Sequence, residues 1–143
     1  MKLTGETDLL HGSCLCGAIT FEITSPFTKF AHCHCRRCRK ATGAAHASNI
    51  YLDPGQLHWL QGQQHIIKYN LPEAASFARW FCGRCGAPVP RISRSGRTAV
   101  VPAGALEEHP ANLPRARIFC GSEAPWTCRG DDITRYDEYP EWW

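Results

Sequence analysis

Cys82-Gly83-Arg84-Cys85-Gly86 is a C-x-x-C turn followed by glycine. This is the form of a zinc knuckle, in which a tight turn brings two thiolates about one tetrahedral edge apart. A second pair lies far upstream in Cys14-Leu15-Cys16-Gly17, and an extended backbone would place both of its side chains on one face. Because each pair stands at an expected strand end beside a glycine turn, we expect the four sulfur atoms to form one closed, structural zinc site. A redox-active C-x-x-C is the alternative, but its flanks lack a βαβ pattern.

A third group of thiols lies in His32-Cys33-His34-Cys35-Arg36-Arg37-Cys38-Arg39, where three cysteines fall within six residues. A zinc ion with three protein ligands keeps one coordination position for water or substrate. The group therefore predicts an open, catalytic zinc site. His32 or His34 is an alternative fourth ligand, although in a strand both rings would point away from the thiols.

The charge around the three-thiol group gives a second argument. Zinc with three thiolates carries one net negative charge and is a poor electrophile unless cations surround it. Arg36, Arg37, Arg39 and Lys40 supply those cations. Because a guanidinium suits bidentate carboxylate contact, we expect Arg36, Arg37 and Arg39 to contact an anionic substrate. A solvated basic loop is the alternative for each of them.

Composition limits the class of protein. The 143 residues are 43% hydrophobic and 20% charged, which favours one globular domain over residues 1–143 and favours neither disorder nor a membrane span. The net charge of +3 is mild and does not favour a nucleic-acid partner. Glu6 and Asp8 interrupt the first eleven residues, so we expect no signal peptide and take the cytoplasm as the compartment. Cysteine clusters there bind metals more often than they form disulfides.

Short β-prone stretches recur between turn signals along the whole chain. We expect strands at residues 18–23, 27–33, 45–52, 65–69, 76–81, 89–92, 98–101 and 115–119. No window of ten or more residues has clean helical periodicity, so the helices should be few and short. The expected fold class is mainly β.

Taken in order, the three cysteine motifs resemble the glutathione-dependent formaldehyde-activating enzyme family, also called the centromere protein V family. The resemblance is carried by residues 12–18, 32–44 and 81–86, with weaker echoes at 103–106 and 118–126. It implies a β-tent fold of small packed antiparallel sheets around a structural zinc. The implied ligands of that zinc are Cys14, Cys16, Cys82 and Cys85, and those of a labile catalytic zinc are Cys33, Cys35 and Cys38.

The resemblance also implies an activity. The named enzyme of the family combines glutathione and formaldehyde to S-hydroxymethylglutathione, which is classified in reverse as carbon–sulfur lyase chemistry. We therefore expect this chain to act on glutathione and formaldehyde or on a related thiol adduct. The glutathione thiolate would attack the formaldehyde carbon, and nearby cations would steady the alkoxide that develops.

Two other functions remain open from the sequence. The segment 117–122 resembles the catalytic strand of methionine-R-sulfoxide reductases, with Cys120 as nucleophile, but that family has no equivalent of the three-thiol group. Alternatively, the chain is a non-catalytic zinc-stabilised binding module with a basic face. That face would comprise Arg36, Arg37, Arg39, Lys40, Arg91, Arg94 and Arg97. Cys120 or Cys128 can also close the three-thiol group through a tertiary contact, and the apolar segment 139–143 allows a homodimer.

Overall fold

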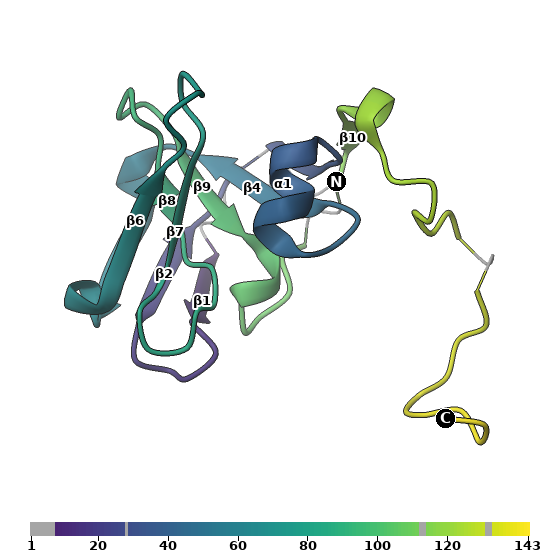
Figure 1. The fold of residues 1–143 in the computed structure, drawn as a ribbon. Helices are drawn as coiled ribbons and strands as arrows, with labels where there is room; N and C mark the ends of the chain where they lie inside the picture. Colours follow the sequence, from purple (N-terminus) through teal and green to yellow (C-terminus); the bar gives the residue numbers. More distant parts are fainter. Residues whose placement is uncertain (1–7, 28, 112–113, 131–132) are drawn as a thin grey trace.

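A computed structural model describes residues 8–27, 29–111, 114–130 and 133–143 of the chain. In these ranges ten strands form three small sheets with one short α-helix (Figure 1). The strands are β1 (Leu9–Ser13), β2 (Thr20–Thr24), β3 (Lys29–Cys33), β4 (Ala47–Leu52), β5 (Leu57–Gln61), β6 (Ile66–Asn70), β7 (Ala78–Cys82), β8 (Arg91–Ile92), β9 (Ala99–Pro102) and β10 (Ala116–Ile118). The helix is α1 (Arg36–Thr42), and the 3-10 turns are η1 (Pro54–Gln56), η2 (Gln63–His65), η3 (Ala103–Ala105) and η4 (Cys120–Ser122). The expected fold class, mainly β with short helices, is confirmed.

The largest sheet has five strands in the order β10-β3-β4-β9-β8. All of its pairs are antiparallel except β10 with β3, which is parallel, so the expectation of purely antiparallel sheets needs this correction. A chain that returns to an edge strand after a long connection can pair in either direction. Here Ile118 pairs with Cys33, and the N–H of His34 donates to the carbonyl of Ile118 at 2.9 Å. The parallel pair therefore brings residues near 118 beside the three-thiol segment.

A three-stranded sheet, β1-β2-β5, packs against one face of the five-stranded sheet. Alternate residues of each strand point to the shared core, as the period of two requires. Phe21, Ile23 and Ile50 are fully buried there. The other buried members of this core are Leu10, Phe27, Phe30, Leu52, Leu57, Ala99 and Val101. The core fixes the five-stranded sheet and leaves its opposite face for other contacts.

A second, smaller core joins the two-stranded sheet β6-β7 to the β1-β2 end of the molecule. Its buried members are Cys14, Ile19, Cys82 and Val89. Two of these four are cysteines from different motifs, so apolar packing and the thiol group coincide at this point. Apolar burial in a core this small contributes little to the folding free energy. A metal ion held by its cysteines can therefore add a large part of the local stability.

The sequence-based strand assignments hold for all eight predicted stretches, with ends shifted by a few residues. Two strands, β1 and β5, were not predicted. Gly12 lowers the strand propensity of β1, yet the fold needs it, because a Cβ at this position would lie within 2.8 Å of the Phe21 ring. In β5 only Leu57 is buried, so the strand lacks a clear alternating pattern. Both strands exist because they pair with β2.

The described part of the chain after η4 runs away from the sheets, as the yellow segment of Figure 1 shows. Tyr139, Trp142 and Trp143 are exposed there. A homodimer through residues 139–143 stays a prediction. No helix within the described ranges is long and apolar enough to cross a membrane.

Candidate functional site

The first thiol group joins Cys14, Cys16, Cys82 and Cys85, whose Sγ atoms all lie within 4.8 Å of one another. The Sγ atoms of Cys14 and Cys16 are 3.7 Å apart, and those of Cys16 and Cys82 are 3.9 Å apart. With Zn–S bonds of about 2.3 Å, the edge of a zinc tetrathiolate tetrahedron is about 3.8 Å. The spacing of these thiols therefore fits zinc, and the group can hold a metal ion.

The local structure of this group differs from the prediction in one respect. Cys14 and Cys16 lie in a turn after β1 and not in an extended strand, with the N–H of Gly17 donating to the carbonyl of Cys14 at 3.2 Å. The turn still brings both sulfurs to one point. Cys82 ends β7, and the N–H of Gly86 closes the C-x-x-C turn on the Cys82 carbonyl at 2.7 Å. The expectation of two half-sites at strand ends beside glycine turns is met.

Backbone donors surround the sulfurs of the four-thiol group. The N–H of Ile19 donates to the Sγ of Cys14 and the N–H of Arg84 to the Sγ of Cys82, both at 3.3 Å. A hydrogen bond from the N–H of Ala87 is the main cause that lowers the pKa of Cys85 to about 6. Such donors stabilise the thiolate relative to the thiol. The backbone is therefore arranged for thiolates, the form that binds a metal.

The second thiol group is Cys33, Cys35 and Cys38, whose Sγ atoms also lie within 4.8 Å of one another. Cys33 ends β3, Cys35 is the N-cap of α1, and Cys38 lies in the first turn of that helix. The Sγ of Cys35 accepts a hydrogen bond from the N–H of Cys38 at 3.3 Å. A short strand running directly into a helix thus converts the C-x-C-x-x-C spacing into three converging sulfurs.

The three thiols differ in how readily they lose a proton. Burial raises the pKa of Cys33 and that of Cys38. Burial also opposes ionisation of Cys35, but hydrogen bonds, first that from the Cys38 N–H, lower the pKa of Cys35 overall. A cation bound among the sulfurs would release the remaining protons, because metal ligation requires thiolates. The donor set fits a thiophilic ion such as zinc.

No fourth ligand joins this group within the described ranges. His32 turns away from it, with its Nδ1 at 2.9 Å from the Ser48 Oγ, as the strand geometry predicted. His34 is fully buried and accepts from the Nε of Arg117 at 3.4 Å. Cys120 and Cys128 are both exposed, and neither belongs to the group. The three-thiol group therefore stays open.

A cavity of about 620 Å³ opens beside the three thiols, within the size range of small-molecule sites. Its lining residues are Cys33, Cys35, Arg36, Arg37, Cys38, Asn49, Tyr51, Ala75, Ser76, Phe77, Arg91, Ser93, Thr98, Val100, Ile118 and Phe119. Arg36 and Arg37 thus line the cavity, and their contact with a substrate stays a prediction. Arg39 is not among the lining residues, and its Nε is buried without a hydrogen-bond partner in the described structure.

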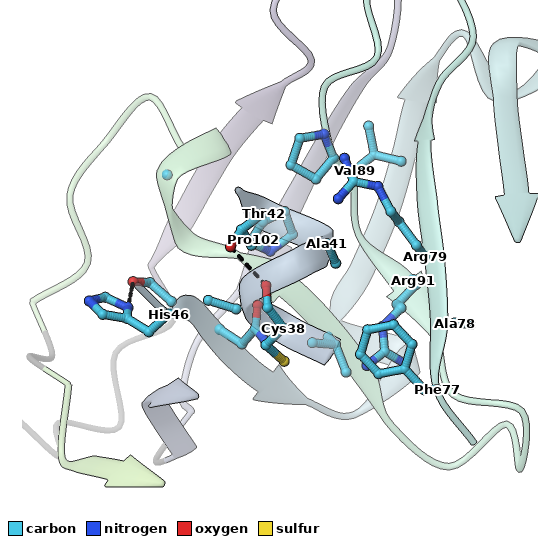
Figure 2. A pocket seen from close by; sticks show the side chains of 16 residues that line it. Cys38, Ala41, Thr42, His46, Phe77, Ala78, Arg79, Val89, Arg91 and Pro102 are labelled. Carbon is cyan, nitrogen blue, oxygen red and sulfur yellow. Dashed lines mark hydrogen bonds between the residues drawn. The ribbon is translucent and has the colours of Figure 1, made fainter. Parts of the chain in front are cut away.

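An adjoining hollow of about 300 Å³ shares Cys38, Asn49, Phe77, Arg91 and Val100 with that cavity. Figure 2 shows Cys38 reaching this hollow from α1, while Arg91 and Phe77 approach it from the other side. The Oγ1 of Thr42 donates to the Cys38 carbonyl at 2.8 Å and fixes the helix at this point. The helix and the sheet are therefore the two walls of one continuous depression.

The sequence did not single out Asn49, Tyr51, Phe77 and Phe119 as site residues. Strand alternation was an available signal for two of them, since Asn49 and Tyr51 follow Ala47, the partner of Cys33, at steps of two. Phe119 has φ 56°, a left-handed conformation that is uncommon for a non-glycine residue. No sequence pattern predicts that conformation or the contact of this segment with β3.

The basic residues of the predicted binding face differ in their surroundings. The Arg94 guanidinium donates to the carbonyls of Leu71 and Ala74 at 3.2 and 2.8 Å and so holds a loop. Arg91 lines the cavity with Arg36 and Arg37. Arg94 thus has contacts within the chain and Arg91 borders the cavity, while the basic face of a binding module stays a prediction.

Fold and site together define a mainly β protein with one closed and one open thiol group, each able to hold a metal ion. The profile of the glutathione-dependent formaldehyde-activating enzyme family matches residues 9–122, most of the chain, and the chain belongs to that family.

One curated relative and one solved structure accompany this family match. Over 82 residues the chain is 38% identical to the "Putative glutathione-dependent formaldehyde-activating enzyme" of Halomonas elongata, covering 54% of this chain and 52% of that protein. The chain thus spans about half the length of this relative. A crystal structure of a Rhodobacter sphaeroides protein aligns with a TM-score of 0.58 and 23% identity, covering 73% of this chain and 97% of that chain. This second likeness shows the fold.

Proposed function

We propose that the chain forms one domain, residues 1–143, with two zinc sites. The four-thiol group would hold a structural zinc, because it ties β1 and β7 together inside the smaller core. The three-thiol group would hold a second zinc whose remaining coordination position faces substrate. The spacing of the sulfurs and the N–H donors around them support both assignments.

We propose further that the chain catalyses the addition of glutathione to formaldehyde, giving S-hydroxymethylglutathione, with the reverse reaction as a carbon–sulfur lyase. The observation that carries this proposal is the open three-thiol group at the wall of a cavity that also exposes Arg36 and Arg37. Family membership supports the choice of reaction.

The reaction needs a thiolate and a place for the developing alkoxide. A zinc ion held by Cys33, Cys35 and Cys38 would lower the pKa of a substrate thiol. The sulfur of that substrate then forms a bond to the formaldehyde carbon while the C=O π bond breaks. The oxygen finally takes up one proton, which balances the proton lost by the thiol.

The side chains around the cavity assist this addition. Arg36 and Arg37 provide positive charge near the developing alkoxide and near the carboxylates of the substrate. Phe77, Ile118 and Phe119 give the cavity apolar walls that reduce the water around the reacting atoms.

The test is the rate of exchange between free formaldehyde and its glutathione adduct, followed by NMR with ¹³C-formaldehyde on zinc-loaded protein. We expect the protein to accelerate exchange above the spontaneous rate and Cys35→Ser to abolish the acceleration. The matched control is Cys120→Ser, which removes an exposed thiol outside the group and should retain activity.

Two outcomes contradict the proposal. Protein with two bound zinc ions that leaves the spontaneous rate unchanged would rule out the reaction and favour the binding module. Loss of activity in Cys120→Ser with retention in Cys35→Ser would instead indicate the reductase-like use of Cys120.

A further inference from the structure

The wall of the cavity opposite α1 is a row of side chains set by sheet register. Tyr51 of β4 pairs with Val100 of β9, and Val100 pairs with Arg91 of β8. Paired residues point to the same face of a sheet, and residues two apart along a strand do so as well. Ala47, four residues before Tyr51, pairs with Cys33, so the row and Cys33 share one sheet face. All three residues of the row line the cavity beside the thiols.

Arg91 has no carboxylate partner among the described residues. It is partly buried, and its guanidinium lies 6.0 Å from the centroid of the Phe77 ring. Burial lowers the pKa of Arg91, while Tyr51 and Cys38 act in the opposite direction, yet an arginine stays charged in proteins. A partly buried guanidinium without a carboxylate to accept its hydrogen bonds is unfavourable in the ligand-free protein. A bound anion would accept the hydrogen bonds of this guanidinium, which would explain why it is kept at this position.

Tyr51 adds a neutral donor to the same row. Burial is the main cause that raises the pKa of Tyr51, and the side-chain amide of Asn49 acts on its hydroxyl in the opposite direction. The hydroxyl therefore keeps its proton near neutral pH and can donate a hydrogen bond. An oxygen anion in front of this row would meet a guanidinium and a phenol together.

The whole cavity is biased toward anions. Arg36 and Arg37 approach it from α1 and Arg91 from β8, and no aspartate or glutamate of the described ranges is among its lining residues. A ligand with several carboxylates would therefore be favoured over a neutral one. The cations on the two walls are carried by different elements, so they can hold different parts of one ligand.

We propose that Arg91, with the hydroxyl of Tyr51 as a second donor, binds a carboxylate of the thiol substrate while the substrate sulfur faces the three-thiol group. This assignment rests on the proposed function. It makes the β4-β9-β8 wall the part of the site that selects an anionic thiol over a neutral one. Arg91 is then a specificity residue that acts on binding and leaves the sulfur chemistry to the three-thiol group.

The test separates carboxylate binding from sulfur chemistry. S-methylglutathione keeps the carboxylates of glutathione but has no free thiol, and its affinity for zinc-loaded protein can be measured by isothermal titration calorimetry. We expect Arg91→Gln to weaken it by about 10- to 100-fold, the loss of a hydrogen-bonded charge, and Tyr51→Phe by about fivefold. Arg91→Lys should recover part of the loss because it keeps the charge.

The matched control is Arg97→Gln, which removes an exposed arginine that does not line the cavity and should leave the affinity unchanged. Zinc content and melting temperature of each variant check the fold. A dimethyl ester of the ligand, with neutral carboxylates, should bind wild type at least tenfold more weakly, and this comparison needs no variant.

Three results would overturn the inference: no binding of S-methylglutathione to wild type, equal affinity of wild type and Arg91→Gln, or equal affinity of acid and ester. The kinetic assay separates these results from failure of the proposed function. Acceleration of exchange that is equal for glutathione and 2-mercaptoethanol would leave the reaction standing and remove the carboxylate site. Arg91-dependent binding without acceleration would do the reverse.

Discussion

The four-thiol and three-thiol groups use the same side chain in two different surroundings. The first collects its sulfurs from the turn after β1 and from the end of β7 with the turn that follows it, far apart in sequence, and two of its cysteines belong to a small apolar core. The second collects all its sulfurs from one β3–α1 junction and borders a cavity with arginines on its walls. A group that ties distant segments contributes to folding, while a local group beside a cavity leaves folding to the rest of the chain.

The largest expected effect is that of Cys82→Ser in the four-thiol group. Structural zinc sites have apparent binding free energies of about 10–16 kcal/mol in small domains, while whole proteins are stable by only about 5–15 kcal/mol. Losing one of four ligands should therefore remove cooperative folding. The measurement is near-UV circular dichroism with zinc analysis on purified protein. A variant with a native spectrum and only the second zinc would end the structural assignment.

The corresponding change in the three-thiol group, Cys35→Ser, should leave the fold intact. Cys35 caps α1 by accepting from the Cys38 N–H, and serine is a favoured N-cap residue, so the helix keeps its cap. We expect one zinc fewer per chain, no exchange activity and a change in unfolding free energy of about 1 kcal/mol or less. Urea denaturation and elemental analysis measure both. Unfolding as severe as that of Cys82→Ser would erase the distinction between the groups.

Cysteine spacing predicted both groups because each motif is local and the thiols carry the chemistry themselves. The C-x-C pair was expected in an extended strand and lies in a turn, but both backbones allow the sulfurs to converge. The strand β1 was not predicted, since the reason for Gly12 is a contact with Phe21 that only the folded sheet reveals. Local signals thus identified the cysteines that come together in each group, while the supporting strands depended on tertiary pairing.

The cavity could not be predicted from the sequence, for the same physical reason. Its wall depends on which residue of β4 faces which residue of β9 and β8, and register between strands separated by long loops is not encoded locally. The parallel pairing of β10 with β3 is equally non-local. Arg91 was therefore assigned to a basic face from its charge alone, although the sheet directs it to the cavity.

Substitutions of two glycines allow the surroundings of the four-thiol and three-thiol groups to be compared. Gly62 and Gly43 both have positive φ, 83° and 67°, so alanine at either costs about 1–2 kcal/mol of backbone strain. Gly43 ends α1, and a Cβ there has nothing within 4 Å. A Cβ on Gly62 would overlap the carbonyl oxygen of Ala18, which follows the C-x-C turn, and would lie 2.9 Å from the Cα of Ile19.

Gly62→Ala should therefore be more destabilising than Gly43→Ala by about 1–3 kcal/mol, the usual cost of overpacking. The measurement is the urea midpoint of both variants with zinc in excess. Equal midpoints would show that the backbone around the four-thiol group yields easily, which is inconsistent with a structural site.

The smallest expected effect is a pH dependence of stability at β1, the strand that leads into the four-thiol group. The Nδ1 of His11 in β1 lies 2.7 Å from a carboxylate oxygen of Glu108, and the other oxygen accepts from the His11 N–H at 2.7 Å. The hydrogen bond to Glu108 raises the pKa of His11, and the same contact lowers the pKa of Glu108. The pair thus ties the strand before the C-x-C turn to the loop after η3.

The two pKa shifts limit the pH range in which the His11–Glu108 pair stabilises the fold, one at its upper end and the other at its lower end. The contribution of His11 is fully present below its unfolded pKa near 6.5 and is lost as the pH rises through its higher folded pKa. That of Glu108 is present above its unfolded pKa near 4.5 and is lost as the pH falls through its lower folded pKa.

Both contributions are present between the two unfolded pKa values, so wild type should exceed Glu108→Gln in urea midpoint most at pH 5.5 and least at pH 9. Because both groups are exposed, 1 M salt should reduce the difference. A difference that grows toward pH 9 would mean that Glu108 supports β1 through its backbone contact and not through the charge of His11.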